Sequence, residues 1–154
     1  MSMTLPRLGR AALTAIAVLA AAPAFAGRTA DETKAFVEKA VAHVKEVGQE
    51  KAFKDFNPDG KYVDGELYIF CLAADGTSVA HGGNANLIGK NLMSVKDPDG
   101  FPAIAEIIKL GLEKGEGWVD YKWPNPVSKK VEVKGTFVKK IDNNLVCGSG
   151  YYKG

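Results

Sequence analysis

The sequence has few of the residues that most catalytic and metal sites use. It holds two histidines and two cysteines in 154 residues, and neither pair has the close spacing of a zinc, haem or dithiol motif. Its serines stand in no nucleophile-elbow motif, and its glycine clusters match neither a P-loop nor a dinucleotide fingerprint. The sequence therefore predicts no catalytic residue, no metal site and no cofactor, and a protein that is not an enzyme.

The sequence also has little net charge. The formal net charge is +2, and Arg7 and Arg10 are the only charged residues among the first 26. Without them, the 20 basic residues become 18, against 18 acidic residues. A neutral protein lacks the basic surface that nucleic acids and anionic membranes attract, so neither is expected as a partner.

Long apolar runs are absent after residue 26. Residues 1–26 combine a cationic start, an apolar middle and the small-x-small sequence Ala24-Phe25-Ala26, which predicts a signal peptide cleaved after Ala26. The alternative is an uncleaved anchor, but the run from Ala11 to Ala22 is too short and too rich in alanine to span a bilayer comfortably. We expect a periplasmic or secreted protein in which residues 27–154 form one domain.

The two cysteines, Cys71 and Cys147, each fall within a predicted strand. An even number of cysteines in an exported protein usually indicates disulfide pairing, so we predict a Cys71–Cys147 bond. If the two strands are neighbours, the bond joins the middle of the sheet to its C-terminal strand. The alternatives are two free buried thiols and, third, a redox pair.

Apolar periodicity predicts the order helix, two strands, helix, three strands. We expect a long amphipathic helix from about Glu32 to Gly48, capped by Thr29 or Asp31, and a short helical turn that holds Phe53 and Phe56. The later elements are a hairpin over 66–81, a helix over 103–114 and strands over 117–123, 130–141 and 145–152.

Consecutive hairpins favour an α+β fold with an antiparallel sheet. The long first helix must bury its apolar stripe against one face of that sheet. Only the segment 82–114 remains to cover the other face, which predicts a pocket between this lid and the sheet. Asp97 and Asp99 belong to a turn, Asp97-Pro98-Asp99-Gly100, and are not expected to form an acid/base pair.

Two aromatic residues with polar tips mark a candidate binding site. Strand alternation places Tyr121 and Trp123 on one face, one strand away from Lys134. Aromatic rings exclude water, while a phenol, an indole N–H and an ammonium group can donate hydrogen bonds to a carboxylate. The alternative is that both aromatics belong to the sheet core and that Lys134 is solvated.

The chain resembles the single Cache domains, in their small-Cache group, which are PAS-like extracytoplasmic sensor modules of bacterial chemoreceptors and kinases. The resemblance covers nearly all of residues 29–152. It rests on LYIFCLAADGTSVAHGGNANLIGKNL, the DPDG turn before a helix, GWVDYKWPNP, the segment Lys134–Phe137 and the closing CGSGYY. It implies a five-stranded antiparallel sheet with a long N-terminal helix behind it and a pocket for small organic acids on the other face.

Carried onto this sequence, the resemblance implies a set of ligand-binding residues: Lys134, Trp123, Tyr121, His81, Phe137 and Met93. Lys134 would contact the anion, and His81 would be a second donor whose charge responds to pH near neutrality, unless it faces water. Phe137 stands where the family usually has tyrosine, and it reaches the same face as Lys134 only if the strand bulges near Gly135. Met93, with Leu92, would belong to the lid.

The function expected from these residues is a stand-alone sensor-type domain that binds a small carboxylate or similar metabolite without catalysis and without an output domain. A membrane sensor or a transporter is the expected protein partner. The alternative is an interaction protein with the same fold and a filled pocket, which acts on a membrane or periplasmic partner. The oligomeric state is left open.

Overall fold

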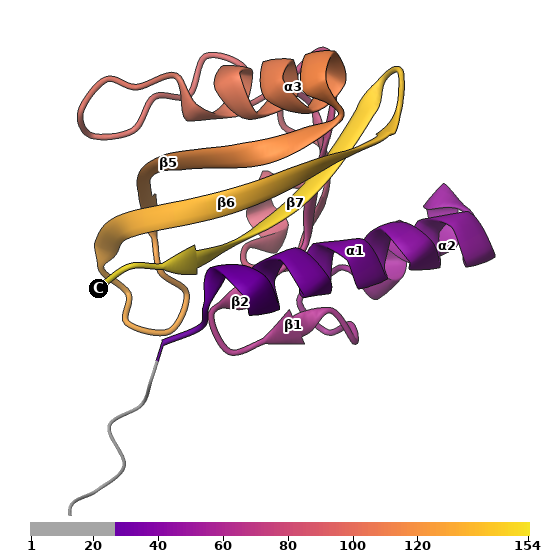
Figure 1. Cartoon of the computed structure of the whole chain (residues 1–154), viewed down its shortest axis with the longest axis horizontal. Helices are drawn as coiled ribbons and strands as arrows, with labels where there is room; N and C mark the ends of the chain where they lie inside the picture. The colour runs from indigo at the N-terminus through magenta and orange to yellow at the C-terminus, as the bar shows by residue number, and fades with distance from the viewer. Residues whose placement is uncertain (1–26) are drawn as a thin grey trace, which may run out of the picture.

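Figure 1 shows a computed structural model of the chain, which describes residues 27–154. The predicted signal peptide, residues 1–26, lies outside the described residues. The helices and strands are α1 (Ala30–Val47), α2 (Gln49–Asp55), β1 (Val63–Asp64), β2 (Leu67–Tyr68), β3 (Phe70–Ala73), β4 (Ser78–His81), a 3₁₀ turn at Ala85–Leu87, α3 (Ala103–Lys114), β5 (Glu116–Pro124), β6 (Val131–Asp142) and β7 (Leu145–Tyr152). No helix in this part of the chain has the length and apolarity needed to cross a bilayer.

Helix α1 begins where its capping residue predicts. The Thr29 hydroxyl accepts a hydrogen bond from the backbone N–H of Glu32, and the Glu32 carboxylate accepts one from the backbone N–H of Thr29. This capping box satisfies two N–H groups that the first turn leaves free. The helix ends at Gly48, whose φ of 83° favours glycine. Its buried side chains form one stripe along its length: Thr33, Val37, Ala40, Val41 and Val44.

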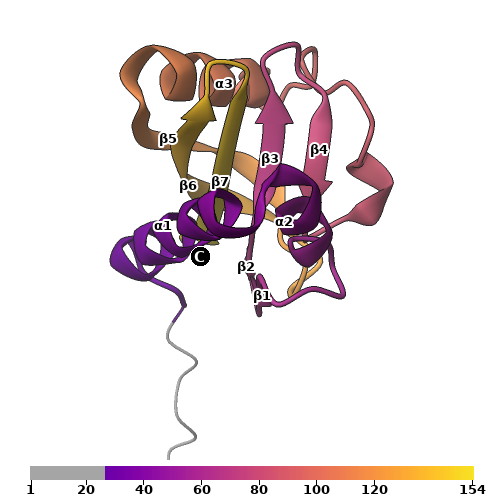
Figure 2. The ribbon, with the colours of Figure 1, turned by 90° about the vertical axis from the view of Figure 1, so that its right-hand side faces the viewer.

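The sheet has five strands in the order β4-β3-β7-β6-β5, and all of its pairings are antiparallel. Helix α1 packs against β6 and β7 on one face, and α3 packs against β5, β6 and β7 on the other (Figure 2). The α+β fold, the sheet and the helix on each face confirm the sequence-based prediction. We call the face under α3 and the segment 82–102 the lid face, and the opposite one the α1 face.

The structure adds one detail at the first predicted strand. The first strand of the hairpin predicted over 66–81 is divided into β2 and β3. Strand β2 pairs with β1 in a separate two-stranded hairpin. The backbone N–H of Ile69, between them, donates to the carbonyl of Tyr62. A turn at Asp75 and Gly76, within the hairpin predicted over 66–81, then joins β3 to β4, with the Asp75 carboxylate accepting from the N–H of Thr77.

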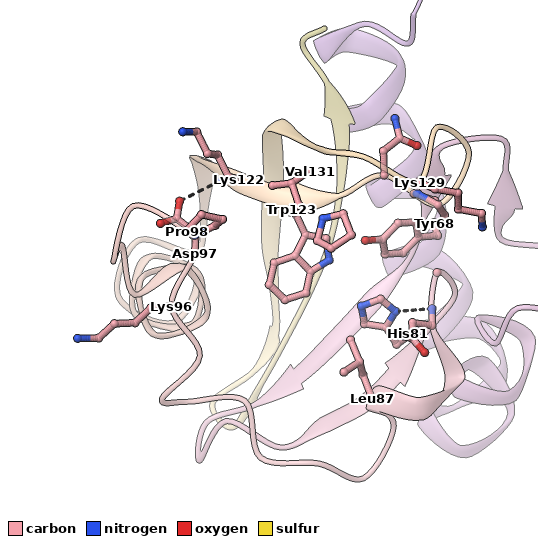
Figure 3. Close-up of a pocket in the computed structure, with 15 residues that line it drawn as sticks. Tyr68, His81, Leu87, Lys96, Asp97, Pro98, Lys122, Trp123, Lys129 and Val131 are labelled. Atoms are coloured by element: carbon pink, nitrogen blue, oxygen red, sulfur yellow. Dashed lines mark hydrogen bonds between the residues drawn. The ribbon is translucent and has the colours of Figure 1, made fainter.

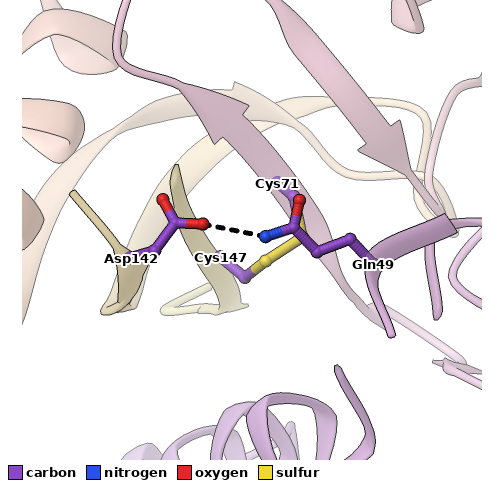
Figure 4. Close-up of a disulfide and its surroundings, with 4 residues drawn as sticks. All are labelled: Gln49, Cys71, Asp142 and Cys147. Carbon is purple, nitrogen blue, oxygen red and sulfur yellow. Dashed lines mark hydrogen bonds between the residues drawn. A yellow bond between two sulfur atoms is a disulfide. The ribbon is translucent and has the colours of Figure 1, made fainter. Parts of the chain in front are cut away.

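The two cysteines lie directly opposite each other on the adjacent strands β3 and β7. They form the predicted disulfide, which is fully buried on the α1 face (Figure 4). The alternative of two free thiols is therefore wrong for this structure. Beside the disulfide, the Gln49 side-chain amide donates to the Asp142 carboxylate over 2.8 Å, which links α2 to the turn that precedes β7. The disulfide joins β3 and β7, two inner strands of the sheet, on the face opposite the lid face.

Candidate ligand-binding site

Two adjacent cavities lie on the lid face, an outer one and a small inner one, and they share three wall residues. The outer cavity has a volume of about 500 Å³, within the size range of small-molecule pockets. Its walls combine aromatic, proline and amide side chains with charged ones (Figure 3). The lining residues are Tyr68, His81, Gly83, Asn84, Leu87, Lys96, Asp97, Pro98, Lys122, Trp123, Pro124, Asn125, Pro126, Lys129 and Val131. The inner cavity, about 10 Å³, is lined by Tyr68, Phe70, Leu72, His81, Leu92, Ile104, Tyr121, Trp123 and Lys134.

Lys134 is the only charged side chain in the wall of the inner cavity. It lies on β6 and is 1% exposed, so the alternative of a solvated lysine is wrong. Its Nζ donates to the Tyr68 hydroxyl over 2.8 Å and stands 4.2 Å from the centre of that ring. No carboxylate of the described residues forms an ion pair with it. Burial lowers the pKa of Lys134 to about 7, and the charge of Glu66 opposes this shift.

Tyr68 is the site residue that sequence reasoning missed. It is 2% exposed, and its hydroxyl is the partner of Lys134. Burial raises the pKa of Tyr68 well above its usual value, so the hydroxyl keeps its proton. The signal available was alternation: Tyr68 shares its parity with Phe70 and Leu72, which line the same cavity. The break in pairing at Ile69 does not disturb that parity.

Glycines make room for these two side chains. A Cβ on Gly150 of β7 would lie 2.5 Å from Cε of Lys134 and 2.5 Å from Oγ1 of Thr136. A Cβ on Gly83 would lie 2.7 Å from Cε1 of Tyr68. Both distances are below any ordinary carbon contact, so a larger residue at either position displaces a wall of the site.

His81 faces the site, as the resemblance implies, and the alternative that it faces water is wrong because it is 5% exposed. Its Nδ1 accepts a hydrogen bond from the backbone N–H of Asn84 over 2.9 Å (Figure 3). In the neutral ring, Nε2 therefore carries the hydrogen and is the available donor. Burial, followed by the nearby charge of Lys134, lowers the pKa of His81 to about 3. The expectation that its charge responds to pH near neutrality is wrong.

Tyr121 and Trp123 reach the lid face together, as strand alternation predicts. Tyr121 is 5% exposed, and its hydroxyl accepts a hydrogen bond from the Thr136 hydroxyl over 3.1 Å. The Trp123 ring contacts it edge-on, with 5.8 Å between ring centres. Both line the inner cavity, and both also pack against the lid-face core. The alternative that these rings belong to the sheet core therefore holds alongside their position in the site wall.

Two expected positions require correction. Phe137 packs with the α1-face core, under the aliphatic stripe of α1, and lines neither lid-face cavity. The reason is that β6 pairs in regular register from Val131 to Lys140, so the bulge expected at Gly135 is absent and Phe137 alternates away from Lys134. Met93 packs at the margin of the lid-face core and also lines neither cavity, whereas its neighbour Leu92 lines the inner one.

The loop before α3 is fastened to the rim of the site by Asp97. Its Oδ1 accepts from the N–H groups of Asp99 and Phe101, and its Oδ2 accepts from the N–H of Lys122 on β5. These hydrogen bonds, with that from Lys122 the largest cause, lower the pKa of Asp97. The carboxylate thus acts as a turn and docking group, which agrees with its predicted role.

The fold and the site together define an α+β domain with a ligand-sized pocket on the lid face next to a buried lysine. The Cache domain family model dCache_2 matches residues 33–154, and the chain belongs to this family. The predicted resemblance to Cache domains is therefore confirmed, while the small-Cache group and the stand-alone form stay predictions. Cache domains are extracytoplasmic sensors that bind small-molecule ligands.

Two relatives with sequence similarity are a sensor kinase and a chemotaxis protein. The sensor histidine kinase MctS of Rhizobium johnstonii is 32% identical over 99 residues, which is 64% of this chain and 20% of MctS. The methyl-accepting chemotaxis protein McpP of Pseudomonas putida is 29% identical over 75 residues, which is 48% of this chain and 14% of McpP. The chain thus spans a fifth or less of the length of these relatives.

Solved structures of chemosensory domains share the fold. A methyl-accepting chemotaxis protein from Vibrio parahaemolyticus aligns with a TM-score of 0.70 at 22% identity, over 79% of this chain and 86% of the other. A Cache chemosensory domain described for carboxylic acid recognition aligns with a TM-score of 0.69 at 25% identity, over 80% and 92%. The chain therefore resembles the ligand-binding domains of chemoreceptors.

Proposed function

We propose that this chain is an exported sensor domain that binds a small organic acid without catalysis, with Lys134 as the anion-binding residue. The observation that carries the proposal is a buried ammonium group whose only hydrogen-bond partner among the described residues is a neutral hydroxyl. A buried charge without a counter-charge is costly, and a ligand carboxylate supplies that counter-charge where the protein does not. The carboxylic acid recognition described for one structural neighbour supports the same ligand class.

The surrounding groups suit a carboxylate with a short apolar body. Nε2–H of His81 and the ammonium of Lys134 are donors, whereas Phe70, Leu72 and Leu92 offer only apolar surface. Because a carboxylate accepts several hydrogen bonds, it can take one from each donor. We further propose that the predicted cleavage after Ala26 releases the domain outside the cytoplasm, where it presents its ligand to a membrane sensor or transporter.

The test is thermal melting of residues 27–154 against acetate, propionate, pyruvate, lactate and succinate. A ligand that binds only the native state stabilises it by RT ln(1 + [L]/Kd), about 2.7 kcal/mol at a hundredfold excess over Kd. We expect a shift with one or more acids, its loss in Lys134→Met, and its retention in Lys130→Met, which removes an exposed lysine before the same strand. An equal shift in Lys134→Met would refute the role of Lys134.

The second candidate is an interaction protein with a filled pocket, and the volume of the inner cavity favours it. About 10 Å³ accommodates at most one water molecule. If none of the acids shifts the melting temperature of the wild-type protein, this candidate replaces the first. The decisive measurement is then capture of a membrane or periplasmic partner, with Lys134→Met binding it as well as the wild type does.

A further inference from the structure

The inner and outer cavities share three wall residues, Tyr68, His81 and Trp123. These side chains separate the space at Lys134 from the outer cavity of about 500 Å³, and Figure 3 shows the indole of Trp123 opposite the rings of Tyr68 and His81. A carboxylate at Lys134 needs more room than about 10 Å³, so the walls of the inner cavity must move apart when an acid binds, and the three shared side chains decide whether the ligand also reaches the outer cavity.

Two of the three residues are held in place. The Tyr68 hydroxyl accepts from Lys134, and its ring faces the backbone of Gly83 with no room for a Cβ. His81 is fixed by the N–H of Asn84 at Nδ1 and packs on Tyr68, with 5.0 Å between ring centres. Both are nearly inaccessible to solvent.

Trp123 is held less firmly. It is only partly buried, and it lies near the end of β5, which is an edge strand of the sheet. Its ring touches Tyr121 edge-on and packs at the margin of the lid-face core. An indole is also the largest of the three side chains, so its position has the greatest effect on how far a ligand can extend from Lys134.

From this division of the site we infer that Trp123 sets the ligand's size: it confines the acid to the space at Lys134, and its removal joins the two cavities and admits longer acids. The inference rests on the proposed function, since it assumes a carboxylate at Lys134. The ligand class of the wild-type protein is then a short-chain monocarboxylate. The outer cavity, where Leu87, Val131 and prolines offer apolar surface beside charged and amide side chains, becomes available to the alkyl chain only when the indole is absent.

The test measures affinities by titration calorimetry at pH 6.5 for acetate, propionate, butyrate, valerate and hexanoate. In the wild type we expect affinity to fall beyond the short acids. In Trp123→Ala we expect it to rise about fourfold with each methylene beyond propionate, the factor that corresponds to ~0.8 kcal/mol per buried CH₂, and thus about 60-fold at hexanoate. Trp123→Leu, which keeps an apolar side chain, replaces Trp123→Ala if that variant does not fold.

The chain offers a matched control, Trp118→Ala. Trp118 lies on the same strand, is 41% exposed, and contacts Phe137 and Tyr151 instead of the cavities. We expect it to keep the wild-type order of acids. Identical orders in wild type and Trp123→Ala, or a uniform loss for every acid, would overturn the inference while short-acid binding at Lys134 stands. Failure of every acid to bind the wild type would overturn the proposed function and this inference with it.

Discussion

Replacing Lys134 with methionine is expected to stabilise the empty protein. Folding lowers the pKa of this lysine from 10.5 to about 7, mainly by burial. At 1.36 kcal/mol per pKa unit, holding the ammonium inside the fold costs about 5 kcal/mol when it is fully charged. Methionine has a similar length and no charge to desolvate, but the Tyr68 hydroxyl loses its partner at a cost of about 1–3 kcal/mol. The variant should be about 2–4 kcal/mol more stable at pH 6.

The sign of the pH dependence follows from the same shift. Below pH 7 the lysine is protonated in both states, so the full cost is present. Between pH 7 and 10.5 the unfolded chain binds one more proton than the folded chain, so wild-type stability rises with pH by up to about 1.4 kcal/mol per unit. At pH 9 the advantage of the variant has therefore shrunk by about 3 kcal/mol. Groups that titrate equally in both proteins cancel in the difference.

The assay is urea unfolding of wild type, Lys134→Met and Lys130→Met at pH 6 and pH 9. Lys130 is exposed, so its replacement should change stability by less than about 0.5 kcal/mol at either pH. If Lys134→Met is less stable than wild type at pH 6, or if its advantage is the same at both pH values, then Lys134 is not an uncompensated buried charge and the argument for an anion site is refuted.

Three further predictions concern the ligand and the framework of the site. Because a carboxylate binds the charged ammonium, the affinity for the acid should fall about tenfold per pH unit above pH 7. At pH 8.5, Lys134 should therefore take up about one proton when the acid binds, which calorimetry in two buffers of different ionisation enthalpy measures. Gly150→Ala, which places a Cβ 2.5 Å from Cε of Lys134, should weaken acid binding at least tenfold while costing about 1–3 kcal/mol in urea unfolding; unchanged affinity would contradict this account. Replacing both cysteines with alanine should cost about 4–5 kcal/mol, from loop closure over 76 residues, measured against the wild type with and without reductant.

Periodicity predicted the framework because burial repeats along each element. The stripe of α1 and the alternation of β5 and β6 depend only on which side chains are apolar, so the order of helices and strands along the chain and the placement of Tyr121 beside Trp123 could be derived from the sequence. The same alternation correctly places Phe137 on the face of the sheet opposite Lys134. The resemblance suggested a bulge at Gly135, and the regular register of β6 shows that alternation alone was the better guide.

The electrostatics of the site could not be derived in the same way. The pKa of His81 depends first on its burial and then on the charge of an ammonium group 53 residues away, and both exist only in the folded chain. Tyr68 escaped notice for a related reason: a tyrosine in an apolar strand is ordinarily a core residue, and only the approach of Lys134 makes it part of a site. Long-range pairs between polar groups leave no periodic signal.

The two faces of the sheet carry opposite energetic effects of similar size. The disulfide on the α1 face is expected to contribute about 4–5 kcal/mol, and Lys134 on the lid face to cost about 5 kcal/mol at neutral pH. The groups point to opposite sides of the sheet, so their effects should add. Lys134→Met should restore about 2–4 of the roughly 4–5 kcal/mol lost with the disulfide, so a variant with both cysteines replaced by alanine and Lys134 by methionine should be about 0–3 kcal/mol less stable than the wild type at pH 6. If the triple variant and the cysteine double variant had the same free energy of unfolding, the buried charge of Lys134 would not destabilise the protein, and the argument would be refuted.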